Sequence, residues 1–324
     1  ILPYARTYAF YILLAAPFMA SSCVLNNVLR YEGRAAFAMV GLVSGGLLNI
    51  FGDWLMVNVL DMGVRGAGLA TAISQTISFS ILLTMFLTGK TESKLQLKCA
   101  LKMRAEDVLL ICKTGFPSMM RQGLSSVSTM VLNGQAGVYG DAAVAAMSIV
   151  NRVCFFAFSV GLGIGQGFQP VSAFNYGAKK YDRVRKGFLA TWGMGEVFLG
   201  IFAIVGFFNA EFLVSLFRDD PEVIAIGTVA LSAQMIALFF QPLSVCANMM
   251  FQSIGKNGVA SFLSMLRSGL FLIPILLVLS AALGLTGIEI AQTVSDILTF
   301  IVSVPFVISF LKTLKQLETE QSRG

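Results

Sequence analysis

The sequence of 324 residues contains no histidine and few charged residues. Only 12% of its residues are charged, whereas soluble domains carry roughly 25%. The missing histidine removes the commonest metal ligand and the commonest general base. The five cysteines include no C-x-x-C pair, so neither a metal centre nor a disulfide framework is expected. These absences argue against an enzyme and against a bound cofactor.

Long apolar runs take the place of the missing charge. The sequence is 56% hydrophobic, with a mean hydropathy of +0.79. Nine runs have the ~20 residues that a helix needs to cross a bilayer, which predicts an all-α integral membrane protein. The predicted spans cover residues 8–29, 35–59, 66–87, 108–139, 142–170, 184–208, 223–251, 259–283 and 287–311.

Lysine and arginine gather in every second connection between the predicted spans. The connection at residues 179–186 holds five of them, whereas the connections of the opposite set hold only Arg65 and Arg218. Because basic connections stay in the cytoplasm, we expect this set and the C-terminus to be cytoplasmic. The placement accounts for the net charge of +6 without a nucleic-acid partner.

Two parts of the sequence resemble each other. Residues 29–34 match 251–256, and 66–74 match 287–295, at an offset of about 221 residues. The first three spans therefore repeat as the last three, as in transporters built from two related bundles. We expect two pseudo-symmetric six-helix lobes with twelve spans, of which three precede Ile1 and leave the N-lobe of this chain incomplete.

The predicted domains follow from this repeat. Residues 1–88 form the second half of the N-lobe, 89–107 a cytoplasmic linker, 108–312 the C-lobe and 313–324 a cytoplasmic tail. The linker is the longest polar stretch, as expected of a connection between domains.

A carboxylate lies inside the second apolar run. Placing Asp53 in a membrane helix costs at least ~2.5–3.5 kcal/mol, and Asn49 precedes it by one helical turn. Thr71 lies at a comparable depth on the next predicted span. A carboxylate, an amide and a hydroxyl provide oxygen ligands for Na⁺ or a group that binds a proton. We therefore expect a cation or proton site, with a structural helix–helix hydrogen bond as the alternative.

Five further charged residues fall within predicted spans. Each is a candidate for the substrate path by its position, and a fixed ion pair or an extended side chain that reaches the interface is the competing interpretation. They are Arg121, Arg152, Glu196, Arg267 and Asp296.

A glycine-rich stretch at residues 161–167 superficially resembles a phosphate-binding loop. No strand precedes it, so phosphate binding is not expected. The i, i+4 spacing of Gly161 with Gly165, and of Gly163 with Gly167, predicts close packing between helices instead.

Several separated motifs resemble the multidrug and toxic compound extrusion (MATE) family. They are GQGFQPVSAFNYGAKK at 165–180, DAAVAAMSIVNR at 141–152, and GFPSMMRQ at 115–122. The similarity extends over the whole chain and is greatest to the bacterial MepA-like branch. The resemblance implies twelve helices in two lobes and export of drugs and organic cations in exchange for Na⁺ or H⁺.

The resemblance also implies where the coupling ion binds. Asn49, Asp53 and Thr71 match an N-lobe cation network that an Asp on the first helix completes in the family, and that helix is absent here. Some members use acids on the seventh and tenth helices instead. The matching stretches of this chain, 121–129 and 233–248, contain no acid. An N-lobe coupling site is therefore favoured.

The resemblance, together with the apolar runs and the repeat, implies a secondary active efflux antiporter that works by alternating access in a bacterial inner membrane. We expect a monomer in the lipid bilayer with small organic, cationic substrates and no cofactor apart from H⁺ or Na⁺. A flippase for lipid-linked or other anionic precursors is the alternative on the same fold. It requires a basic cavity, for which Arg121, Arg152 and Arg267 are the candidates. A channel and a membrane-embedded enzyme are less well supported, because the repeat favours alternating access and no nucleophile–base pair is evident.

Overall fold

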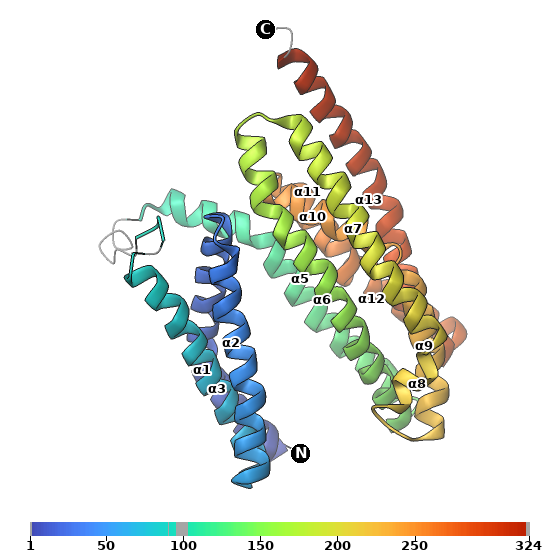
Figure 1. The fold of residues 1–324 in the computed structure, drawn as a ribbon. Coiled ribbons are helices and arrows are strands. Elements are labelled where there is room, and N and C mark those ends of the chain that lie inside the picture. The colour runs from blue at the N-terminus through green and yellow to red at the C-terminus, as the bar shows by residue number, and fades with distance from the viewer. Residues whose placement is uncertain (1, 90, 95–102, 322–324) are drawn as a thin grey trace. The chain divides into compact units, whose positions relative to one another are not determined.

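The computed structural model describes residues 2–89, 91–94 and 103–321. All regular elements in these ranges are helical, which confirms the all-α prediction (Figure 1). The chain divides into two compact units, Ile1–Met103 and Arg104–Gly324, which are described separately below. The predicted linker and tail include residues 90, 95–102 and 322–324, which lie outside the described residues.

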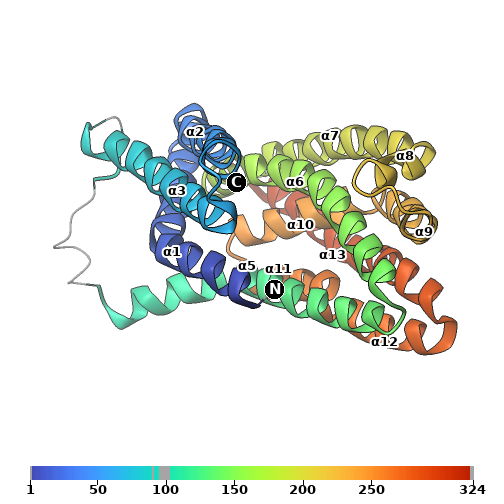
Figure 2. The same ribbon diagram turned by 90° about the horizontal axis from the view of Figure 1, so that it is seen from below.

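The first unit, referred to below as unit 1, is a cluster of three long helices. Its elements are α1 (Leu2–Tyr31), α2 (Ala35–Asp53), the π-helical turn η1 (Trp54–Val59) and α3 (Gly63–Leu87). Each helix packs against the other two (Figure 2). The helices approach closely where side chains are small: the hydroxyl of Ser78 on α3 donates a hydrogen bond of 2.8 Å to the carbonyl of Gly41 on α2.

The second unit, unit 2, is a larger bundle. Its elements are α5 (Ala105–Gly137), α6 (Asp141–Gly177), α7 (Tyr181–Phe208), α8 (Ala210–Ser215), α9 (Pro221–Ala237), α10 (Gln241–Ser253), α11 (Asn257–Met265), the π-helical turn η2 (Leu266–Leu270), α12 (Leu272–Leu283) and α13 (Leu285–Gln321). The helices α6, α7, α10 and α13 pack around a core of buried aliphatic and aromatic side chains. Figure 1 shows α6 and α7 side by side.

Seven helices in the described ranges are long and apolar enough to cross a membrane. If the bent pair of helices α9 and α10 is counted as one span, the number of candidate spans in the described ranges is eight. The helix α5, which corresponds to the expected span 108–139, is not among them. Its second half is rich in serine, threonine, asparagine and glutamine, which lowers its hydropathy. The structure thus supports seven or eight spans, and nine remains a prediction from the sequence.

Two breaks in the helices of unit 2 position polar side chains. The axes of α9 and α10 differ by 55° across a break of three residues. Pro242 lies in the first turn of α10. Backbone N–H groups in a first turn have no partner within the helix, so proline loses no helical hydrogen bond there. The π-helical turn η2 interrupts the path from α11 to α12 and carries Arg267. Such turns often occur at functional sites.

The sequence repeat has a structural counterpart in the turn that follows α1 and α10. In both turns a glycine adopts a positive φ, +75° at Gly33 and +80° at Gly255. The backbone N–H of the residue after the glycine donates to the carbonyl five positions earlier, at 2.9 Å in each turn. Asn26 and Asn248 each donate a side-chain hydrogen bond to the carbonyl twelve residues later, at 2.8 and 2.6 Å. The repeated residues therefore form the same turn at the end of each helix.

A second matched place lies at Gly66 and Gly287. A Cβ atom on Gly66 would lie 2.8 Å from the carbonyl oxygen of Met56 in η1. A Cβ atom on Gly287 would overlap the carbonyl oxygen of Leu279 at the end of α12. Only glycine allows the start of each helix to lie against the backbone that precedes it.

The glycine-rich stretch of α6 packs on one side only. A Cβ on Gly161 would lie 2.9 Å from the side chain of Leu199 on α7, and one on Gly165 would lie 3.1 Å from Met249 on α10. Apart from neighbouring residues of α6, no atom of the described residues lies within 4 Å of a Cβ placed on Gly163 or Gly167. The prediction of close packing is confirmed for the first pair and wrong for the second, since residues two apart on a helix face different sides.

Candidate functional site

In unit 1, two of the three predicted coupling residues contact each other. The side-chain amide of Asn49 on α2 donates a hydrogen bond of 3.3 Å to the hydroxyl oxygen of Thr71 on α3. The Thr71 hydroxyl donates in turn to the carbonyl of Ala67, at 2.9 Å. Gly52 lets the two helices approach here, because a Cβ on it would lie only 3.1 Å from the side chain of Ala70. The hydrogen bond fixes the orientation of Asn49.

Asp53 lies one turn further along α2, and its carboxylate is not satisfied. The side chain is half-buried, and its buried Oδ1 atom has no hydrogen-bond partner among the described residues. No hydrogen bond of the described structure joins it to Asn49 or Thr71. It is the last residue of α2, directly before η1. Because a buried polar atom without a partner is costly, this oxygen is suited to bind a proton or a cation.

The described residues contain no group of three or more His, Cys, Asp or Glu side chains that could hold a metal ion. A cation at Asp53 would therefore depend on neutral oxygen ligands, such as the amide of Asn49 and the hydroxyl of Thr71. Neutral oxygens with one carboxylate match the donor types that hard cations prefer.

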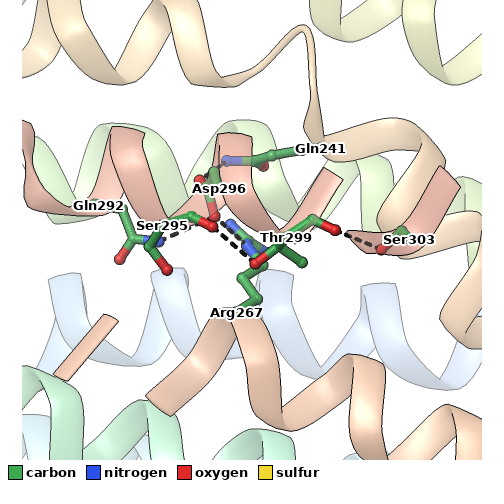
Figure 3. A network of polar contacts seen from close by, with 7 residues as sticks. All are labelled: Gln241, Arg267, Gln292, Ser295, Asp296, Thr299 and Ser303. Atoms are coloured by element: carbon green, nitrogen blue, oxygen red, sulfur yellow. Dashed lines mark hydrogen bonds and ion pairs between the residues drawn. The ribbon is translucent and has the colours of Figure 1, made fainter. Parts of the chain in front are cut away.

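In unit 2, Asp296 on α13 is the centre of a hydrogen-bonded network (Figure 3). Its side chain is almost fully buried, and it accepts from three others. The Nε of Arg267 lies 2.9 Å from Oδ1, and the amide of Gln292 donates to the same oxygen at 3.1 Å. The amide of Gln241 donates to Oδ2 at 2.8 Å. Both carboxylate oxygens are thus satisfied, and the bend before α10 is tied to α13 and η2.

Arg267 also contacts an aromatic ring. Its guanidinium lies over the face of Phe158 on α6, 4.2 Å from the ring centroid. An arginine over a ring is favourable, and more so where water is excluded. The ion pair and the ring together hold Arg267 in one place between η2, α6 and α13.

A cavity of about 260 Å³ opens beside this network. Arg121 on α5 and Arg267 both line it, and no acidic residue is among its described lining residues. Amide and hydroxyl side chains from α5, α10 and α13 make up most of the remaining polar wall, including Asn248 and Gln241. The walls are completed by apolar side chains such as Phe158. The lining is therefore basic and rich in hydrogen-bonding groups.

The other two predicted charged residues lie elsewhere. Arg152 is exposed and does not line the cavity. Glu196 accepts a hydrogen bond of 2.7 Å from the indole N–H of Trp192, one turn earlier on α7. Of the five charged residues, the structure thus brings Arg267 and Asp296 into an ion pair and places Arg121 on the same cavity.

Sequence reasoning missed three polar residues of unit 2. Gln241 and Gln292 support Asp296, although neither is charged. Glu289 is a buried acid on α13, with 5% of its surface exposed. Each interrupts an apolar run, which is the signal that could have identified it. Glu289 has no ion pair within the described part of the chain.

The sequence profile of the MatE family matches residues 117–278, half of the chain. Two similar staphylococcal proteins are both named multidrug export protein MepA. The one from Staphylococcus saprophyticus is 26% identical over 297 residues, which are 90% of this chain and 65% of that protein. The one from Staphylococcus aureus strain MSSA476 is 28% identical over 276 residues, 85% of this chain and 60% of that protein. The chain spans less than two thirds of the length of these curated relatives.

Solved structures of transporters have the same fold. A crystal structure of a MATE protein in complex with MaD3S has a TM-score of 0.87 at 23% identity, covering 96% of this chain and 70% of that one. A multidrug resistance MATE family transporter in an outward-facing conformation has a TM-score of 0.85 with the same identity and coverage. A MOP superfamily transporter from Pyrococcus furiosus, described as having a binding pocket of reverse polarity, has a TM-score of 0.87 at 23% identity, covering 95% and 70%.

These findings agree with one another in fold and in sequence. The family profile covers half of the chain, and the relatives match over most of its length. The chain belongs to the MatE family, whose members are membrane transporters and not enzymes.

Proposed function

We propose that the protein is a secondary active exporter of small organic molecules that exchanges them for H⁺ or Na⁺ by alternating access. Family membership and the names of the staphylococcal relatives support export. The buried Oδ1 of Asp53, which has no partner in the described structure, is the observation that carries the coupling mechanism.

In this mechanism Asp53 binds the coupling ion in unit 1. A proton or Na⁺ neutralises the carboxylate, which lowers the free energy of burying it. Asn49 and Thr71 provide the neighbouring amide and hydroxyl oxygens, held by their mutual hydrogen bond. Because the ion binds the conformation with the buried carboxylate more tightly, its binding and release shift the protein between two conformations.

Replacing Asp53 with asparagine tests this mechanism. The amide has nearly the same shape but neither binds a proton nor carries a charge, so ion-driven transport is expected to fall to the background level. The measurement is efflux of ethidium from membrane vesicles under an imposed pH gradient without Na⁺, and under an imposed Na⁺ gradient at constant pH. The gradient that drives the unmodified protein identifies the coupling ion.

Asp61→Asn is the matched control for this experiment. Asp61 is exposed and has a φ of +50°, which asparagine tolerates well. The same chemical change should therefore leave transport unchanged there. Undiminished ion-driven efflux in Asp53→Asn would show that Asp53 does not couple transport.

The setting of this exporter is also proposed. Apolar helices of sufficient length and bacterial relatives support a multi-span protein of the bacterial cytoplasmic membrane. The basic connections support a cytoplasmic C-terminus, and we propose a monomer. From the resemblance we propose a cationic substrate. Its charge would lie near the carboxylate of unit 1, because the cavity of unit 2 is lined by arginines and has no acid among its described lining residues.

Export of a lipid-linked anionic precursor is the second candidate. The observation in its favour is that Arg121 and Arg267 line one cavity. The exposed Arg152 does not contribute to it. The volume of about 260 Å³ lies just below the ~300–1,000 Å³ of ordinary small-molecule sites, and this favours a small ligand over a large lipid-linked one.

A further inference from the structure

We propose that the cavity of unit 2 binds small amphiphilic monoanions, with Arg121 as the residue that pairs with the carboxylate or phosphodiester group. The inference rests on the proposed export function. It adds an anionic class of substrate to the cationic class proposed above. It is carried by the charge of the cavity, by the state of Arg121 and by unsatisfied polar atoms in the wall.

The cavity carries one unbalanced positive charge. The ion pair at 2.9 Å with Asp296 neutralises Arg267. Arg121 has no ion pair in the described part of the chain, although it lines the same cavity as Arg267. An unpaired cation within a membrane protein is costly, and an anion entering the cavity would remove this cost.

Asn248 orients Arg121 without neutralising it. The Nη1 atom of Arg121 lies 3.4 Å from Oδ1 of Asn248, a long hydrogen bond to an uncharged acceptor. The amide nitrogen of Asn248 is itself held by the carbonyl of Ala260 at 2.6 Å and the hydroxyl of Ser264 at 2.7 Å. Because Asn248 is fixed from two sides, the guanidinium of Arg121 is directed into a defined place. Its remaining N–H groups are available for a bidentate contact with a carboxylate or phosphate.

Two buried polar atoms of the wall lack partners in the described structure. They are the hydroxyl oxygen of Ser244 and the Oε1 atom of Gln241, whose residues are 7% and 4% exposed. Both residues line the cavity. A hydroxyl can donate to an anion, whereas an amide oxygen accepts from an N–H or O–H group of the ligand. The wall is thus matched to an anionic group next to a hydrogen-bond donor.

The apolar part of the lining indicates the rest of the ligand. Side chains such as Phe155, Leu132 and Met249 lie around the polar groups. Since Asp296 cancels one of the two arginines, the site should prefer one negative charge to two. A small amphiphile with a single carboxylate or phosphodiester group fits this combination.

The test is equilibrium binding to the purified chain in detergent. Dansylglycine and N-(2-aminoethyl)dansylamide carry the same fluorophore on linkers of similar length with opposite charges, so their dissociation constants compare the effect of charge. We expect tighter binding of the anion, and Arg121→Gln should weaken its binding by about tenfold or more, the loss expected for a charge-assisted hydrogen bond. Tighter binding of the cation, or an unchanged affinity in Arg121→Gln, would overturn the proposal.

Two further variants keep the result interpretable. Arg152→Gln removes an exposed arginine outside the cavity and should leave the affinity for dansylglycine unchanged. Arg121→Lys retains the charge but not the bidentate geometry, so intermediate affinity is expected even if Arg121→Gln does not fold. Equal loss in Arg152→Gln would show that the effect is one of general surface charge and would contradict the site.

Competition identifies the anionic group and separates this proposal from the coupling mechanism. Displacement of dansylglycine by octanoate but not by octyl methyl phosphate, a phosphodiester that also carries one charge, assigns the site to carboxylates, and the reverse assigns it to phosphodiesters. Displacement by neither contradicts the site. Because no ion gradient is present, Asp53→Asn should bind dansylglycine normally. Failure of binding therefore leaves the coupling role of Asp53 standing, and failure of coupling leaves the anion site standing.

Discussion

Replacing Arg267 with glutamine is expected to lower the free energy of unfolding by about 3–5 kcal/mol, the range found when one partner of a buried ion pair is removed. Asp296 would lose its cationic partner with only 2% of its surface exposed. The amides of Gln241 and Gln292 would still donate to it, but neither carries a compensating charge. The substitution also removes the cation from the face of Phe158. The measurement is thermal unfolding of the purified chain in detergent.

A double substitution separates loss of the pair from loss of shape. Arg267→Gln combined with Asp296→Asn removes both charges of the pair, and such replacements are often neutral. The double variant should therefore unfold at a higher temperature than Arg267→Gln alone. Glu289→Gln serves as the comparison, because Glu289 is a buried acid on the same helix without an ion pair in the described structure. Its neutralisation should not destabilise the protein. A mild effect of Arg267→Gln, equal to that of Glu289→Gln, would show that the ion pair does not hold the unit together.

Replacing Gly287 with alanine is expected to destabilise unit 2 by more than the ~1–3 kcal/mol of ordinary overpacking. The added Cβ would overlap the carbonyl oxygen of Leu279, and it would also lie 2.9 Å from the backbone nitrogen of Ser280. Backbone atoms cannot move aside as the end of a flexible side chain can. The start of α13 and the end of α12 would have to separate, which would lower the midpoint temperature of unfolding.

Two other glycines calibrate this result. Gly66→Ala at the matched place of unit 1 should destabilise in the same direction, because its Cβ would lie 2.8 Å from a backbone carbonyl oxygen. Gly163→Ala lies within α6, where no described atom outside neighbouring residues of the helix is within 4 Å of the added Cβ, and alanine favours helix over glycine by roughly 0.5–1 kcal/mol. This control should be neutral or stabilising. If Gly287→Ala is no more harmful than Gly163→Ala, the close approach does not limit stability.

The membrane helices and the repeat follow from local features of the sequence. Apolar runs of sufficient length form helices because a bilayer leaves backbone groups no other partners. The turns at Gly33 and Gly255 depend on residues within a dozen positions of each glycine. Such short-range patterns are visible in a single chain. The sequence predicts a span at residues 108–139, but the corresponding helix α5 is not among the candidate spans of the described structure, because its hydroxyl and amide residues lower its hydropathy. Arg121 and its neighbours on this helix line a cavity instead.

The sequence by itself determined the helical class, the repeat, the close packing at Gly161 and Gly165, and the place of a carboxylate in an apolar run at Asp53. Only the tertiary structure decided which polar groups meet. Asp296 binds Arg267 from 29 residues away and Gln241 from 55 residues away, and no periodicity links positions on three separate elements. Tertiary packing also left Oδ1 of Asp53 without a partner in the described structure. The free-energy cost of a charge in an apolar run can be read from its neighbours in the sequence. The groups that stabilise the charge come from other helices, and tertiary packing decides which helices lie beside it.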